Sequence, residues 1–132
     1  MLLQWELAKN IRLIVIHPNY YQQHLLLTHF VINTSAVYVR LEGDNLETVD
    51  LLGQIEVVLR ATTRTDFEYL VVDECDRAKA SALDGVIVDL LDIIPEIRVV
   101  ISSRHLPHII LEDATIRAVT QIIPIDSGLG LP

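Results

Sequence analysis

The chain has 132 residues, of which 51% are hydrophobic, and a formal charge of −8 at pH 7. This length suits a single domain, and the apolar content is sufficient for a buried core. A phosphate-binding surface needs clustered basic residues, so 10 Lys and Arg against 18 Asp and Glu argue against direct nucleic-acid binding.

The sequence has few features that indicate a membrane segment, secretion or disulfide bonding. No stretch reaches the roughly 18 uncharged apolar residues of a membrane span, and residues 1–10 lack the basic start and apolar run of a signal peptide. The single cysteine, Cys75, cannot form an internal disulfide, and it stands beside a predicted strand end where burial is expected. We therefore expect a cytoplasmic protein.

In chain order, apolar runs typical of strands alternate with segments of helical periodicity. Five strands are predicted, at residues 12–16, 36–41, 69–74, 98–101 and 120–125. Four helices are predicted, at residues 20–32, 46–59, about 81–91 and, as a broken helix, 106–118. Residues 2–9 fit either a short helix or an edge segment, and Pro124 makes the fifth strand an edge strand or a strand end.

This alternation predicts the α/β class: a three-layer sandwich whose mostly parallel five-stranded sheet is covered on both faces. Residues 1–125 are expected to form one domain. The turn-rich residues 126–132 are expected to be a linker-like tail.

Polar residues end two of the predicted strands. Asp73 and Glu74 follow the third, and Ser102, Ser103 and Arg104 follow the fourth. The carboxyl ends of parallel strands open into the crevice where α/β folds place ligand chemistry. The sequence therefore predicts that any site would lie at this edge of the sheet.

Four pieces occur in a characteristic order: LVVDECDR at residues 70–77, Ile94-Pro95, ISSR at residues 101–104, and Pro107. Together they resemble the core of the STAND class of P-loop NTPases, in particular large bacterial transcription regulators of the maltose-activator type. The similarity covers about residues 12–125, and the second half carries nearly all of it. It implies a P-loop-NTPase-like fold in which Asp73 is the Mg²⁺-linked acid and Glu74 the water-activating acid. Ser102, Ser103 and Arg104 would be sensor-like groups at a terminal phosphate.

The first turn departs from this family. A phosphate-binding turn needs glycines, a lysine and a Ser or Thr, whereas residues 17–27 read HPNYYQQHLLL and no glycine precedes Gly43. The family's proline matches Pro18, but its glycines fall on Tyr20 and Gln22, its lysine on Gln23 and its hydroxyl residue on His24. We therefore expect no ATP hydrolysis and no cofactor. The vestigial nucleotide-site positions are Tyr20, Gln22, Gln23, His24, Asp73, Glu74, Ser103 and Arg104.

Other interpretations remain open at this point. Asp73 and Glu74 are read as solvated acids, or as partners of Arg104 or Arg77. A pseudo-receiver or flavodoxin-like regulatory domain would use Asp73 as the acceptor carboxylate and Ser102 or Ser103 as the hydroxyl. A small enzyme with an acid/base or metal pair ranks last.

A metal site at His105 and His108 lacks a third ligand nearby. The favoured hypothesis is a catalytically degenerate NTPase-like regulatory or interaction module, the N-terminal part of a bacterial transcriptional or signalling regulator. Its partners would be proteins or the remainder of a longer chain, with homo-oligomerisation left open and no membrane contact.

Overall fold

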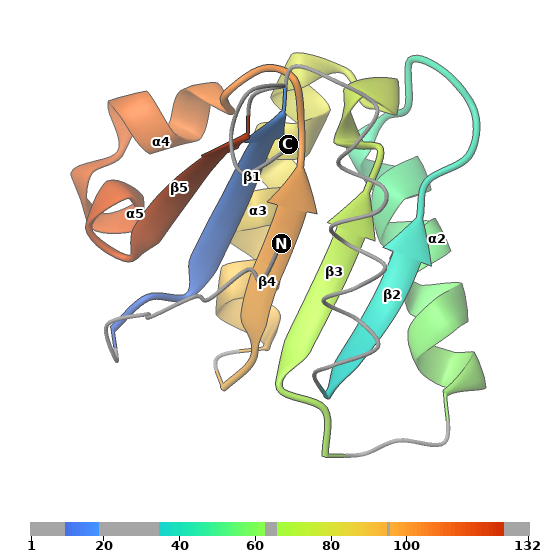
Figure 1. Ribbon diagram of the computed structural model, residues 1–132. Coiled ribbons are helices and arrows are strands. Elements are labelled where there is room, and N and C mark those ends of the chain that lie inside the picture. Colours follow the sequence, from blue (N-terminus) through green and yellow to red (C-terminus); the bar gives the residue numbers. More distant parts are fainter. Residues whose placement is uncertain (1–9, 19–34, 63–65, 95, 126–132) are drawn as a thin grey trace, which may run out of the picture.

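A computed structural model describes residues 10–18, 35–62, 66–94 and 96–125. Five strands form one sheet in the order β2-β3-β4-β1-β5 (Figure 1). They are β1 Leu13–Pro18, β2 Ala36–Arg40, β3 Tyr69–Asp73, β4 Arg98–Ser102 and β5 Thr120–Ile125. Every pairing between neighbouring strands is parallel.

Helices connect the strands. They are α2 Thr48–Ala61, the short 3₁₀ helix η1 Cys75–Arg77, α3 Ala80–Ile93, α4 His108–Glu112 and α5 Ala114–Ala118. Figure 1 shows α2 and α3 behind the sheet and α4 and α5 beside β5. No helix in the described ranges is long and apolar enough to cross a membrane.

The α/β fold with a five-stranded sheet is confirmed, and the sheet is parallel throughout rather than mostly parallel. Among the described strands, β5 pairs with β1 alone, as an edge strand does. The strand order also decides between two interpretations. A flavodoxin-like domain has the order 2-1-3-4-5, with β1 between β2 and β3, whereas here β4 lies between β1 and β3. The receiver-like alternative is therefore wrong.

Side chains on both faces of the sheet are buried. On the face toward α2 and α3, strand residues such as Leu13, Leu70 and Val99 pack with the helical stripe that includes Leu51 and Ile87. On the other face, a second cluster includes four strand residues that are fully buried: Ile14, Ile16, Val71 and Val100. Strands buried on both faces read as continuous apolar runs, which is why β1, β3 and β4 were predictable.

The observed element ends differ slightly from the predicted ones. α2 begins at Thr48 instead of residue 46, because Leu46 is extended and its backbone pairs with Ala78. Glu47 is then the N-cap and forms a capping box with Asp50.

The predicted helix at residues 106–118 is indeed broken, at Asp113. The carboxylate of Asp113 accepts hydrogen bonds from the backbone N–H groups of Thr115 and Ile116 in the first turn of α5. Residues 2–9, the predicted helix at residues 20–32 and the predicted tail at residues 126–132 lie outside the described residues.

Candidate functional site

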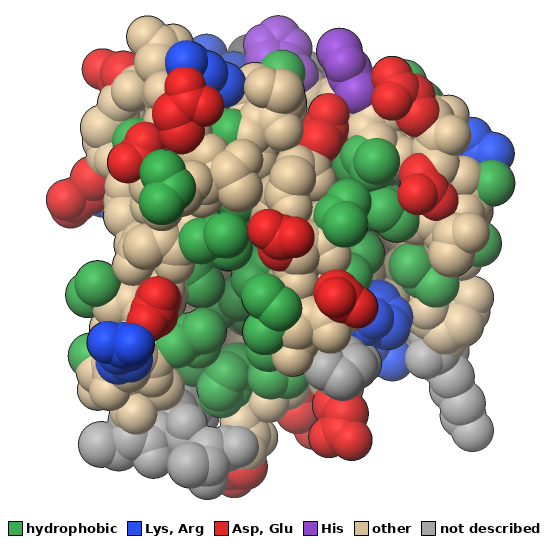
Figure 2. All heavy atoms as spheres, turned by 180° about the vertical axis from the view of Figure 1, so that it is seen from behind, with side chains coloured by type: hydrophobic (Ala, Val, Ile, Leu, Met, Phe, Trp, Pro, Cys, Tyr) green, Lys and Arg blue, Asp and Glu red, His purple; other side chains and the backbone are tan. Residues whose placement is uncertain are grey.

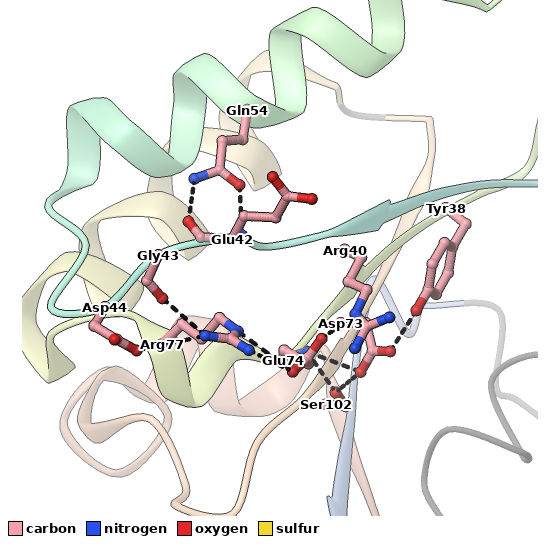
Figure 3. Close-up of polar contacts among 10 residues, drawn as sticks. All are labelled: Tyr38, Arg40, Glu42, Gly43, Asp44, Gln54, Asp73, Glu74, Arg77 and Ser102. Atoms are coloured by element: carbon pink, nitrogen blue, oxygen red, sulfur yellow. Dashed lines mark hydrogen bonds and ion pairs between the residues drawn. The ribbon is translucent and has the colours of Figure 1, made fainter.

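The site is centred on Asp73, the last residue of β3. Its carboxylate is fully buried, and among the described residues three groups donate hydrogen bonds to it (Figure 3). Ser102 Oγ donates to Oδ1 at 2.6 Å, the Glu74 backbone N–H donates to the same oxygen at 2.8 Å, and Tyr38 Oη donates to Oδ2. A buried carboxylate requires such donors because it has lost its hydration.

Sheet geometry brings these groups together. Tyr38, Asp73 and Ser102 alternate with residues of the helix-facing cluster, so they share the face that carries Val71 and Val100. The order β2-β3-β4 places Asp73 between the two donors. Burial of the phenol, reinforced by the hydrogen bond to Asp73, raises the pKa of Tyr38 above its usual value. The hydroxyl therefore stays protonated and keeps donating.

Glu74 has left-handed backbone geometry, with φ of 61°. That conformation costs a residue with a Cβ about 1–2 kcal/mol, so contacts must hold it. Arg40 Nε donates to Oε2 of Glu74, and an Arg77 nitrogen lies 3.2 Å from Oε1. The hydrogen bond to Glu74 raises the pKa of Arg40. Both oxygens of the second acid are thus engaged by guanidinium groups.

Arg77 also links Glu74 to the loop between β2 and α2. Its Nη1 donates to the Gly43 carbonyl at 3.1 Å and lies 3.4 Å from an oxygen of Asp44. The backbones of Leu46 and Ala78 are paired in the same region. The loops that follow β2 and β3 are therefore joined by side-chain and main-chain bonds.

Ser103 Oγ and the backbone N–H of Arg104 contact Asp76 rather than Asp73. The Arg104 backbone N–H donates to both oxygens of Asp76, at 3.0 and 3.1 Å. Ser103 Oγ lies 2.7 Å from the His105 carbonyl and 3.3 Å from Asp76 Oδ1, and His17 Nδ1 donates to the Ser103 carbonyl at 3.2 Å. The Arg104 side chain is exposed and forms no ion pair within the described ranges.

The structure corrects the interpretation of the two acids. Asp73 is not solvated, since the sheet buries it, and within the described ranges its side-chain donors are neutral hydroxyls rather than Arg104 or Arg77. The predicted pairing of an acid with Arg77 is confirmed for Glu74. The predicted positions Tyr20, Gln22, Gln23 and His24 lie outside the described residues.

Sequence reasoning missed two contributors to this site, Tyr38 and Arg40. Both lie on β2, whose register sets Arg40 against Asp73. Their spacing of two residues places them on one face of a strand. That signal becomes useful only once β2 is known to neighbour β3.

A cavity of about 330 Å³ lies behind this edge, between η1, the start of α3 and the loop before α4. Its lining includes Cys75, Asp76, Ser103, His105 and His108. The Cys75 thiol is buried, which raises its pKa, and its Sγ lies 3.4 Å from the Val72 carbonyl. It is thus a protonated packing group rather than a nucleophile. No group of three or more potential metal ligands occurs in the described part of the chain.

Comparisons with known proteins give a structural answer only. No protein-family model matches the sequence, and no curated protein matches it. Among solved structures, a DNA polymerase III gamma subunit-related protein from Thermotoga maritima is similar, with a TM-score of 0.55 and 18% identity. That likeness covers 88% of this chain but 41% of the Thermotoga chain.

A second similar structure is Drosophila ORC bound to DNA, with a TM-score of 0.51 and 14% identity over 94% of this chain and 85% of the other. Identities this low establish the fold and nothing finer. Both likenesses extend over most of this chain, whose described part is a parallel α/β sheet with flanking helices. The chain therefore has a P-loop-NTPase-like fold.

Proposed function

We propose that the chain is a catalytically degenerate NTPase-like module that acts in regulation through protein contacts. One observation carries this proposal: both acids at the end of β3 are already satisfied by the protein. Asp73 accepts from Ser102, Tyr38 and the Glu74 N–H, and Glu74 is held by Arg40 and Arg77. An Mg²⁺-linked acid and a water-activating acid instead need free lone pairs directed at a ligand.

The residues present do not suit Mg²⁺-nucleotide. In the sequence, the turn after β1 carries Tyr20, Gln22, Gln23 and His24 where phosphate binding needs glycine, lysine and a hydroxyl. The hydroxyl of Ser102, the candidate sensor, donates a hydrogen bond to Asp73. The polar side chains at this edge of the sheet are therefore better suited to holding the strand ends together than to hydrolysing a nucleotide.

The regulatory part of the proposal has two supports. The order of LVVDECDR, Ile94-Pro95, ISSR and Pro107 resembles bacterial transcription regulators of the STAND class. The charge of −8 disfavours nucleic acid and leaves proteins as the natural partners. We accordingly place the module in the N-terminal part of a bacterial transcriptional or signalling regulator, contacting other proteins or the rest of a longer chain.

Calorimetric titration with ATP and ADP, with and without Mg²⁺, tests the loss of catalysis. We expect no binding tighter than about 1 mM, which corresponds to about −4 kcal/mol, and no phosphate release. A combined Tyr20→Gly, Gln22→Gly, Gln23→Lys and His24→Thr variant serves as the matched gain-of-function control. Micromolar affinity of the natural chain together with measurable turnover would overturn the proposal.

A further inference from the structure

The outer surface of α2 and α3 carries large apolar side chains in solvent. Four of them are exposed: Val49 by 75%, Val57 by 68%, Val88 by 43% and Ile93 by 67%. Single exposed apolar residues are ordinary, but a group on two adjacent helices marks an interaction surface. Figure 2 views this side and shows hydrophobic side chains gathered between acidic ones.

We call this surface the α2–α3 face. It comprises the outward residues Val49, Asp50, Glu56, Val57, Val88, Asp89, Asp92 and Ile93. The two helices pack side by side, with Thr48 Oγ1 lying 3.5 Å from the Ala82 carbonyl. Each helix has 14 residues, so the face is about 21 Å long at 1.5 Å per residue.

The charge of the face is negative and largely uncompensated. α3 contains three aspartates and neither lysine nor arginine, and within the described ranges Asp89 and Asp92 form no ion pair. The basic residue of α2, Arg60, is paired with Glu56. Arg12, which reaches the end of α3, donates to the carbonyl oxygens of Leu91 and Ile94.

The apolar and acidic side chains of the α2–α3 face limit the kind of partner that can bind it. A second copy would set aspartates against aspartates, and nucleic acid or an anionic membrane would be repelled in the same way. A segment with apolar residues on one side and basic residues beside them would bury the exposed valines and pair with the acids. Resting on the proposed role as an interaction module, we infer that the α2–α3 face docks a basic amphipathic helix of about 14 residues from a partner protein.

A defined probe tests this inference. A fluorescein-labelled Leu/Lys peptide of about 14 residues, with leucines at helical spacing, is titrated with the whole chain and followed by fluorescence anisotropy. We expect micromolar binding that weakens at least about tenfold between about 0.05 M and 0.5 M salt. A scrambled peptide and a Leu/Glu peptide should bind at least about tenfold more weakly.

Variants locate the binding. Asp89→Lys with Asp92→Lys should weaken the interaction at least about tenfold, and Ile93→Ser about fivefold. Asp66→Lys with Glu68→Lys makes the same charge change at exposed residues before β3 and should stay within about twofold. Circular dichroism confirms that each variant is folded.

Several outcomes overturn the inference: no binding of the Leu/Lys peptide, equal loss in both charge-reversed variants, or equal binding of the Leu/Glu peptide. A natural chain that sediments as a dimer, and as a monomer after Ile93→Ser, would assign the face to a second copy instead. The nucleotide titration is independent of this assay, so failure of docking and failure of the proposed loss of catalysis are distinguishable.

Discussion

Removing the Ser102 hydroxyl should destabilise the fold because it takes a donor from a buried charge. Ser102 Oγ donates to Asp73 Oδ1 at 2.6 Å and also lies 3.2 Å from the Glu74 backbone nitrogen. Hydrogen bonds to charged groups contribute about 1.5–3 kcal/mol, against about 1 kcal/mol for neutral pairs. Ser102→Ala should therefore lower the free energy of unfolding by about 2–3 kcal/mol.

A double-mutant cycle isolates the charge. In an Asp73→Asn background the retained carbonyl oxygen can still accept from Ser102 and from the Glu74 N–H, while the new amide donates to the Tyr38 hydroxyl oxygen. The cost of Ser102→Ala should then fall to about 1 kcal/mol, because a neutral hydrogen bond replaces a charged one.

Urea unfolding followed by circular dichroism measures each free energy. Ser35→Ala is the matched control, because its hydroxyl lies 3.4 Å from a backbone carbonyl at the exposed start of β2; we expect less than about 0.5 kcal/mol. The reasoning fails if Ser102→Ala has an equally small effect, or if it costs the same in the natural chain and in the Asp73→Asn background.

Two further predictions concern pH and helix propensity. Burial raises the pKa of the Cys75 thiol, so the thiol loses its proton at a lower pH in the unfolded chain than in the folded one. The contribution of this thiol to the free energy of unfolding is therefore fully present below about pH 9 and is lost as the pH rises above it. Cys75→Ala should make that alkaline fall, measured by urea unfolding across pH, shallower by up to about 1.4 kcal/mol per pH unit, and an unchanged slope would refute the assignment. Gly53→Ala meets no atom within 4 Å and should raise the free energy of unfolding by about 0.8–1 kcal/mol. A new Cβ at Gly85 would lie 3.2 Å from Thr48 Oγ1, so Gly85→Ala should gain less, and equal gains in thermal melts would contradict this packing.

The fold was largely predictable because the strands of this sheet are buried on both faces. Continuous runs such as residues 12–16 and 98–101 have few alternatives to a central strand. The start of α2 was not predictable, because Leu46 looks like the first residue of an amphipathic stripe. Its backbone instead pairs with Ala78, which follows β3, and is therefore extended.

The candidate site was predictable in location but not in bonding. Asp73 and Ser102 were expected at the same edge of the sheet, and they meet there. Local sequence cannot say which strands flank β3, so it could not assign Tyr38 to Asp73 or Arg40 to Glu74. The resemblance to STAND regulators stays a prediction, since structural similarity at 14–18% identity reaches only the fold.

The backbone pairing of Leu46 with Ala78 has a consequence for how the chain folds. Leu46 N–H donates to the Arg77 carbonyl, and Lys79 N–H donates to the Leu46 carbonyl. This bridge closes a loop that contains all of α2 and β3, and closing such a loop costs chain entropy before any contact rewards it. We therefore expect the first turn of α2 to reach its final geometry only once residues 77–79 lie beside Leu46. The middle and end of α2, which carry Ile55, are free to form helix earlier.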